Sequence, residues 1–194
     1  MNELMAARSL TTLPVVTLGG DAVAHVKDTV CDAVAGRITG FTLTGRGLLS
    51  GPLKEGLPWA AVHALGHDAV MIRDRRGLVG SAAVTERRQS LRGRVLGARV
   101  LTESGAEIGT VLDVVVEGGT GGRVVGFRVA ASKRFLPGPT RHRRRVYMAR
   151  GATLTVAGRA LVLPDDAARH VADDLSGLAA LVGGMTGHRG RSLP

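Results

Sequence analysis

Short runs of apolar residues, in part alternating with polar ones and separated by glycine-containing turns, make up the chain from residue 15 to residue 163. Runs of this length and spacing predict β-strands. The expected strands are 15–18, 22–30, 37–44, 59–64, 69–73 and 78–79, followed by 95–102, 107–117, 123–131, 145–149, 153–156 and 160–163. The segments 46–57 and 133–145 are expected to be loops. Many short strands joined by glycine turns favour small barrels or sandwiches, so the predicted fold class is all-β.

The strand pattern occurs twice. Residues 15–30 align without a gap with residues 100–115, with six identical positions, and residues 36–43 align with residues 122–129 after one residue of slippage. A duplication indicates two structural units of the same kind. We therefore expect a first domain at 10–80 and a second at 91–164, with a charged linker at 82–90 that could hold a single helical turn.

The pattern changes after Pro164. Asp165 and Asp166 can cap a helix, because carboxylates suit its positive N-terminal end. Apolar residues at helical spacing follow, so we predict a C-terminal helix over 165–182. The remaining residues, 183–194, are rich in glycine and arginine and are expected to form a flexible basic tail.

Composition narrows the choice of partners. The chain has 194 residues, a formal net charge of +10 and 44% apolar residues, which supports a folded core and affinity for an anionic surface. Aromatic residues are only 3%, which argues against a stacking platform for single-stranded nucleic acid. Cys31 is the only cysteine, and no apolar run approaches the length of a transmembrane helix. A cytoplasmic location is the default expectation.

The densest charge lies in the loop 133–145 of the second copy. Its cations are the candidate contact residues for an anion or a partner: Lys133, Arg134, Arg141, Arg143, Arg144 and Arg145. Such a loop could hold phosphates without reading sequence. A solvated loop and a contact for an acidic protein are the alternatives. The corresponding loop 46–57 of the first copy carries only Arg46 and Lys54 against Glu55, so the charge is specific to one copy.

Catalysis finds no positive support. His63 and His67 have a spacing that could hold a metal on a helix, but they flank a glycine turn and are interpreted as surface or structural residues. Asp32 beside Cys31 is expected to raise the pKa of the thiol, which is the wrong direction for a nucleophile. No nucleophile or phosphate-loop motif is present, since the glycines of 118–122 suit a mobile hairpin turn. The sequence thus predicts neither enzyme nor metal nor cofactor.

An acid and an arginine recur in both copies. Asp28 and Asp113 occupy equivalent positions late in a strand, and Arg37 and Arg123 recur likewise. Each acid is expected either to accept hydrogen bonds from turn amides or to pair with the arginine of its copy. Because both copies keep these residues while their loops differ, a structural role is the preferred interpretation.

The stretch from Gly105 to Val116, with its Gly-Thr-Val-Leu-Asp-Val, and the stretch Gly122-Arg-Val-Val-Gly-Phe-Arg-Val129 resemble the PRC-barrel family. The first copy departs from this pattern, with Ala24 where the second has Gly109. That family includes the cytoplasmic part of the photosynthetic reaction-centre H subunit and the C-terminal half of a ribosome-maturation factor. The resemblance implies two tandem PRC-type β-barrels and carries over no site residues.

The expected function is a non-catalytic cytoplasmic scaffold or adaptor that binds another protein or itself. The alternative is an RNA- or ribosome-associated factor that uses the loop 133–145. A third, weaker interpretation places the same cations on an anionic membrane surface.

Overall fold

The computed structural model describes residues 3–32, 35–47, 50–85, 89–90, 95–135, 144–150, 155–157, 159–166 and 170–187. The chain divides into two compact units. The first unit comprises 1–94 together with 116–124, and the second comprises 95–115 and 125–194. The compact units therefore do not coincide with the two sequence copies, because the tip of the central hairpin of the second copy belongs to the first unit.

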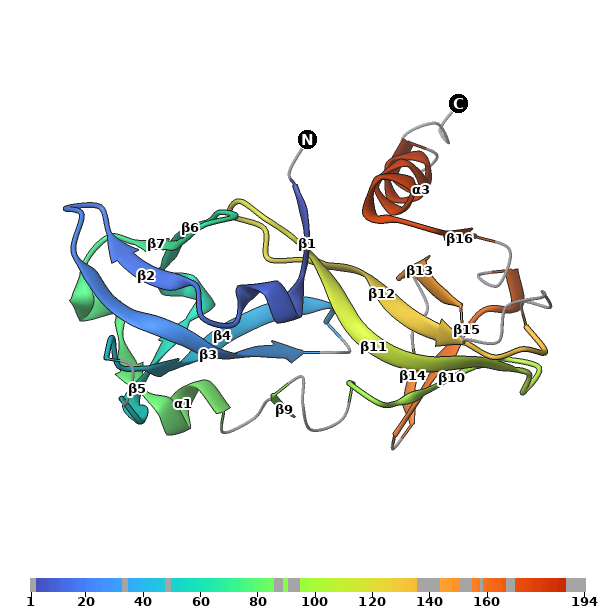
Figure 1. The fold of residues 1–194 in the computed structure, drawn as a ribbon, viewed down its shortest axis with the longest axis horizontal. Helices are drawn as coiled ribbons and strands as arrows, with labels where there is room; N and C mark the ends of the chain where they lie inside the picture. The colour runs from blue at the N-terminus through green and yellow to red at the C-terminus, as the bar shows by residue number, and fades with distance from the viewer. Residues whose placement is uncertain are drawn as a thin grey trace, which may run out of the picture. The chain divides into compact units, whose positions relative to one another are not determined.

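The first unit is a sheet with the strand order β6-β7-β2-β3-β4-β5-β8, with β9 added to β3 (Figure 1). Its strands are β2 (Pro14–Thr17), β3 (Ala22–Asp32), β4 (Arg37–Thr44), β5 (Pro52–Pro58), β6 (Val62–Leu65), β7 (Val70–Ile72), β8 (Val79–Gly80) and β9 (Gln89–Ser90). The short β1 (Leu4–Ala6) pairs with β11, whose last residues belong to this unit. Its helices are the 3-10 turns η1 (Ala7–Leu10), η2 (Trp59–Ala61) and η3 (Arg75–Gly77) and the α-helix α1 (Ser81–Thr85).

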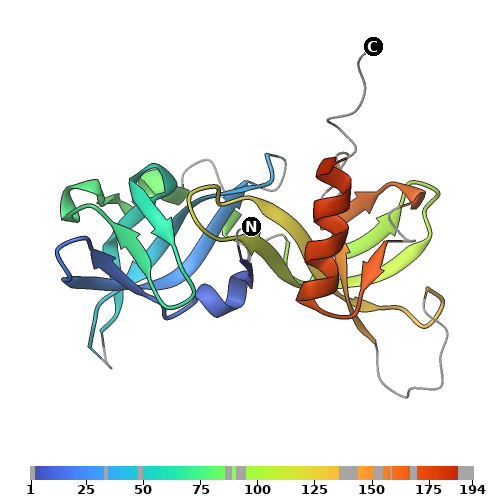
Figure 2. The same ribbon diagram turned by 90° about the horizontal axis from the view of Figure 1, so that it is seen from above.

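The second unit repeats this order as β14-β15-β10-β11-β12-β13-β16. Its strands are β10 (Arg99–Thr102), β11 (Glu107–Glu117), β12 (Val124–Ala131), β13 (Arg145–Ala149), β14 (Thr155–Ala157), β15 (Ala160–Leu163) and β16 (Val171–Ala172). The chain then forms α3 (Leu175–Gly187), which contacts β13 and β16 (Figure 2). Each strand of the second sheet thus has a counterpart in the first, and the predicted all-β fold class is confirmed.

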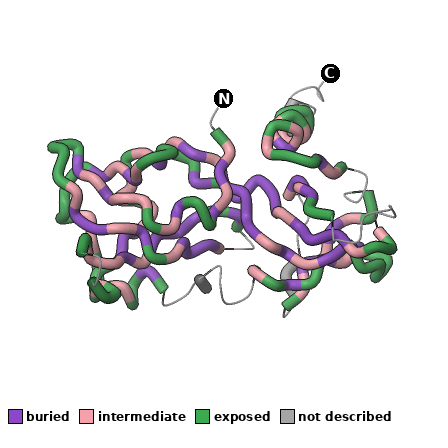
Figure 3. The backbone as a smooth tube through the Cα atoms, viewed as in Figure 1, coloured by how far each residue is buried: buried purple, intermediate pink, exposed green. Residues whose placement is uncertain are grey.

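The core of each unit lies along its two longest strands. Residues of β3 and β11 are buried through most of their length, and β4 and β12 continue the buried surface (Figure 3). Phe41 and Leu43 of β4 are fully buried, as are Val115 of β11 and Val129 of β12. Apolar β-branched and aromatic side chains fit this pleated surface, which explains why valine-rich runs form the central strands.

The turn that precedes the longest strand is built in the same way in both units. The buried Thr17 hydroxyl accepts a hydrogen bond from the Asp21 N–H (3.1 Å), and the buried Thr102 hydroxyl accepts one from the Ala106 N–H (3.0 Å). A side-chain oxygen that satisfies a turn amide stabilises the turn. Both copies therefore have a threonine at this position because its hydroxyl stabilises the turn.

A glycine in each unit makes room for a helix. A Cβ on Gly40 would lie 2.7 Å from Val84 of α1, and a Cβ on Gly126 would lie 3.1 Å from Leu178 of α3. Each Cβ would also lie 2.5 Å from a carbonyl oxygen of the neighbouring strand, that of Leu57 or Met148. Val84 and Leu178 are both buried. Since Gly40 and Gly126 are equivalent in the two copies, α1 is the structural counterpart of α3, and the duplication includes a helix that follows the sheet.

Several elements differ from the prediction. Of the expected strand 59–64, residues Trp59–Ala61 form η2, because the Val62 N–H donates to the Trp59 carbonyl and closes a turn. The expected strand 95–102 begins only at Arg99, because the Ala98 N–H donates to the Val95 carbonyl (3.1 Å). The expected loop 46–57 contains a strand, β5, because Pro52–Pro58 pairs with both β4 and β8. The C-terminal helix begins at Leu175 rather than at residue 165, because Val171 and Ala172 pair with β13. The helix also continues to Gly187, five residues into the predicted tail, whose residues 188–194 lie outside the described part.

The described helices are too short to cross a bilayer. The longest described helix, α3, has 13 residues. Within the described ranges, no helix combines the length and the hydropathy that crossing a bilayer requires.

Candidate functional site

The predicted basic residues lie where β12 ends and β13 begins. Lys133 and Arg134 are exposed after β12, and Arg144 and Arg145 are exposed at the start of β13. The Ala131 N–H donates to the Arg144 carbonyl (2.8 Å), so the two ends of the segment are adjacent. Two further predicted cations, Arg141 and Arg143, lie outside the described residues.

One of these cations already has a partner. The Arg144 guanidinium (Nη2) lies 2.6 Å from the Asp173 carboxylate, just before α3. Both side chains are more than half exposed, so water and salt screen the pair, and such pairs contribute about 0–1 kcal/mol to stability. The charge of Arg144 is therefore partly compensated, and among the described candidate cations Lys133, Arg134 and Arg145 are the ones without an ion-pair partner.

The only cysteine is not a nucleophile. Cys31 is buried in β3, and burial raises the pKa of its thiol to about 12, with a smaller contribution from the Asp32 charge. The predicted direction of the shift is confirmed, although desolvation rather than Asp32 is its main cause. At neutral pH the residue stays a neutral, apolar thiol.

The glycine-rich hairpin tip 116–124 is anchored in the first unit. Leu65 and Gly119 exchange two backbone hydrogen bonds (2.9 and 2.8 Å), and the Trp59 indole N–H donates to the Thr120 carbonyl (3.3 Å). The Gly118 N–H also donates to the Glu3 carbonyl (2.9 Å). The prediction of a mobile turn at 118–122 is therefore wrong, because a sequence pattern of glycines does not reveal the backbone partners that hold them.

The same tip pairs symmetrically with the hairpin turn of the first copy. The Ile38 N–H donates to the Gly122 carbonyl (2.7 Å), and the Val124 N–H donates to the Gly36 carbonyl (2.8 Å). These four residues are equivalent in pairs, since 36 corresponds to 122 and 38 to 124. The two segments thus meet through the same backbone atoms, which gives the recurring glycines a common role.

The recurring arginines lie at the centre of this pairing, where Arg37 faces Arg123. Arg123 lies 3.8 Å from Glu117 (Nη1 to Oε2), and Arg37 lies opposite Asp32 across β3 and β4. Glu117 and Asp32 are equivalent positions, four residues after the acids that the sequence singled out. Of those, Asp113 is buried and accepts a hydrogen bond from the Val114 N–H (2.8 Å). The predicted structural role holds for Arg123, but Glu117 is its ion-pair partner.

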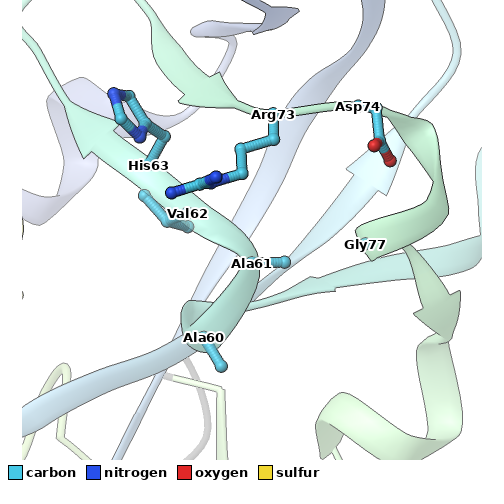
Figure 4. A pocket seen from close by; sticks show the side chains of 7 residues that line it. All are labelled: Ala60, Ala61, Val62, His63, Arg73, Asp74 and Gly77. Atoms are coloured by element: carbon cyan, nitrogen blue, oxygen red, sulfur yellow. The ribbon is translucent and has the colours of Figure 1, made fainter.

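A shallow pocket of about 350 Å³ lies on the first unit. His63 and the Arg73 side chain lie on one side of it, and Asp74 and Gly77 lie on the other. Ala60, Ala61 and Val62 lie between them. Arg73 reaches over Val62 toward His63, whereas the Asp74 carboxylate lies on the opposite side, next to η3 (Figure 4). The sequence analysis considered His63 only as a metal ligand and did not single out Arg73, because β6 and β7 bring the two residues together only in the folded sheet.

The two histidines considered for a metal do not share a site with a third ligand. His67 lies 3.7 Å from Glu3 (Nδ1 to Oε1), and both side chains are exposed. In the described ranges no group of three histidine, cysteine or carboxylate side chains is close enough to hold a metal ion. His63 is instead part of the pocket.

Comparison with known proteins identifies the fold. The sequence profile of the PRC-barrel domain matches residues 2–79 and, again, residues 89–163. No curated protein matches the chain. PRC-barrel domains are protein-interaction modules and form a non-catalytic domain family. Since the two matches cover most of the chain and follow the duplication, the protein belongs to the PRC-barrel domain family, with two tandem copies of the domain.

Proposed function

We propose that the chain is a non-catalytic, cytoplasmic scaffold or adaptor that binds another protein, or a second copy of itself, through its PRC-barrel units. The observation that carries the proposal is the match of two stretches of the chain to a family of interaction modules. A tandem pair of such modules offers two binding surfaces on one chain, and two linked contacts bind far more tightly than either alone.

The anchoring of the hairpin tip 116–124 supports this mode of binding. Backbone hydrogen bonds to Leu65, Ile38 and Gly36 hold a segment that is distant from them along the chain. Extended segments that pair with a sheet obtain affinity from main-chain hydrogen bonds and specificity from side chains. This pairing within the chain supports the proposal that the module engages an extended polypeptide through main-chain hydrogen bonds.

Leu18 is a candidate contact residue. Its side chain is 55% exposed, and it stands where the second copy has Glu103. The two positions are structurally equivalent, because the Leu18 N–H donates to Ile72 (2.9 Å) and the Glu103 N–H donates to Leu163 (3.0 Å). Exposed leucines are common on protein surfaces, but apolar side chains at the centre of an interface contribute most to binding.

The test uses the full chain as bait in extract of its native cells, with chemical cross-linking, together with sedimentation velocity over about a hundredfold concentration range. We expect a stoichiometric protein partner or a concentration-dependent dimer. Leu18→Glu copies the residue of the second unit, so it should fold normally and weaken the complex by about tenfold. Glu103→Gln at the equivalent position is the matched control and should leave the complex unchanged.

A chain that stays monomeric at every concentration and captures no stoichiometric protein would overturn the proposal. RNA and anionic vesicles are tested in parallel at low salt, because the predicted basic contact would bind them electrostatically. Binding that falls steeply with salt, and falls again in the double variant Lys133→Gln and Arg134→Gln, would replace the adaptor with the nucleic-acid or membrane alternative.

A further inference from the structure

The pocket of the first unit is built on an irregular edge strand. In the pairing of β6 with β7, Val62 faces Ile72 and Ala64 faces Met71, so His63 is the extra residue of a bulge. A bulge bends the strand and redirects a side chain. This irregularity is what brings the exposed His63 to the side where Arg73 extends from the end of β7 (Figure 4).

Two hydrogen-bond donors at this pocket are available to a ligand. The guanidinium of Arg73 and the imidazole of His63 form neither an ion pair nor a hydrogen bond with any other described residue. Both side chains are exposed and lie on the same side of the pocket. A guanidinium presents a planar fork of N–H groups that matches the two oxygens of a carboxylate.

The opposite wall is fixed by Asp74 and Gly77. The Asp74 carboxylate accepts a hydrogen bond from the Arg76 N–H (2.7 Å), which caps η3. A Cβ on Gly77 would lie 2.7 Å from the Cβ of Ala61, so only glycine lets η3 approach η2 this closely. The floor between these walls is apolar, with Ala60, Ala61 and Val62.

We propose that this pocket binds a carboxylate group, with Arg73 as the charged donor, His63 as a second donor, and the apolar floor in contact with the aliphatic chain that bears the acid. A volume of about 350 Å³ accommodates a group of this size. The Asp74 carboxylate in the opposite wall repels a doubly charged phosphate more than a singly charged carboxylate. The carboxylate belongs either to a small aliphatic acid or to an acidic side chain of a peptide.

The second copy lacks this arrangement. The parallel pairs Val15–Val70 and Val100–Leu161 align β7 with β15, which places Pro164 where the first copy has Arg73. The site is therefore specific to the first unit. The inference concerns a ligand of that unit alone and holds whether or not the chain is an adaptor.

The experiment is a titration of the full-length, isotope-labelled chain followed by the amide resonances of residues 60–63 and 73–77. The probes are propionate, a short peptide with a single glutamate, the same peptide with glutamine in its place, and inorganic phosphate. We expect saturable shifts with propionate or with the glutamate peptide, and weaker binding of phosphate. Shifts with both, or with either one alone, identify the source of the carboxylate.

Variants of the full chain assign the effect to the pocket. Arg73→Gln should weaken binding by about tenfold, because a charge-assisted hydrogen bond is lost. Arg75→Gln removes the same charge from a neighbouring exposed arginine outside the pocket and should change binding less than about twofold. The absence of saturable shifts at these amides, an equal loss in both variants, or tighter binding of phosphate than of propionate would each overturn the proposal.

Discussion

The two copies share the residues that build the sheet and differ in what covers its edges. Both have the same strand order, and both close the first turn with a threonine hydroxyl. In the first copy a five-residue helix, α1, packs on Gly40, whereas in the second a 13-residue helix, α3, packs on Gly126. The shared residues are therefore explained by folding, and a specific function is to be sought where the copies differ.

Each copy has one surface feature that the other copy lacks. The pocket with Arg73 and His63 is on the first copy, where the second has Pro164 in place of Arg73. The cluster of cations at 133–145 is on the second copy. Of these cations, the structure describes Lys133, Arg134, Arg144 and Arg145. Duplication followed by divergence has thus left each copy with surface chemistry that the other lacks.

The strongest test of the comparison is to remove the helix contact from each copy in turn. Leu178→Ala takes a fully buried leucine from the contact with Gly126 and should lower the free energy of unfolding by about 3 kcal/mol. Val84→Ala removes less apolar volume from the equivalent contact on Gly40 and should cost about 1.5 kcal/mol. Urea denaturation followed by circular dichroism measures both.

Leu181→Ala on the same helix is the control, because this leucine is only half-buried and should cost less than about 1 kcal/mol. Equal losses for Leu178→Ala and Leu181→Ala would mean that α3 is not fixed by its contact with Gly126. The two helices α1 and α3 would then be equivalent in position, but the contact of α3 with its glycine would not contribute to the free energy of unfolding.

The sequence identified the central strands better than the partners of distant segments. The valine-rich strands could be recognised from the pattern alone, because strand periodicity is local. The hydrogen bonds of Thr17 and Thr102 to the turn amides were found only in the structure. The strand β5 was missed because Lys54, Glu55 and Gly56 interrupt any alternation, and only pairing with β4 and β8 makes the segment extended.

In the candidate sites, too, the sequence showed neighbours along the chain but not contacts between distant residues. The cations of 133–145 are adjacent in sequence and could be listed as a cluster, but the ion pair of Arg144 with Asp173 depends on how β13 meets the segment before α3. Arg73 and His63 are brought together by a bulge, and hydropathy patterns do not predict bulges. The hairpin tip 116–124 joins the first unit through backbone atoms, which no residue type reveals.

A second test exchanges one residue between the copies. Gly109 and Ala24 are equivalent, but a Cβ on Gly109 would collide with the Ala130 carbonyl oxygen, whereas Ala24 is accommodated and fully buried. Gly109→Ala should therefore destabilise the chain by about 2 kcal/mol through overpacking against backbone. Ala24→Gly should cost only about 1 kcal/mol, from chain entropy and a lost methyl contact.

Thermal unfolding together with amide hydrogen exchange separates the two variants, because exchange reports which strands open. Protection should fall in β11 and β12 for Gly109→Ala and in β3 and β4 for Ala24→Gly. If Gly109→Ala were as stable as the parent chain, the close approach of β11 to the Ala130 carbonyl would not be the reason why this copy has glycine.

The smallest expected effect on stability concerns Asp165, which stands where the first copy has Asp74. The backbone N–H of Ser104 (3.1 Å) and then its hydroxyl (2.9 Å) donate to the Asp165 carboxylate, and these bonds hold the pKa of Asp165 below its ordinary value. The folded state therefore favours the charged carboxylate. This contribution to stability is fully present above the aspartate pKa of the unfolded chain and is lost as the pH falls through the pKa of the folded state.

Ser104→Gly gives the second copy the residue that the first has at this turn, Gly19. The substitution removes the hydroxyl donor and keeps the backbone donor, which is the larger cause of the shift. The pKa of Asp165 should therefore rise part of the way toward its ordinary value, as measured by the carboxyl carbon resonance during a pH titration. The pH-dependent part of the stability difference between the variant and the parent should also disappear well below the parent's Asp165 pKa, where both carboxyls are protonated. An unchanged titration of Asp165 would mean that the hydroxyl contributes nothing, and that the two copies do not differ at this turn.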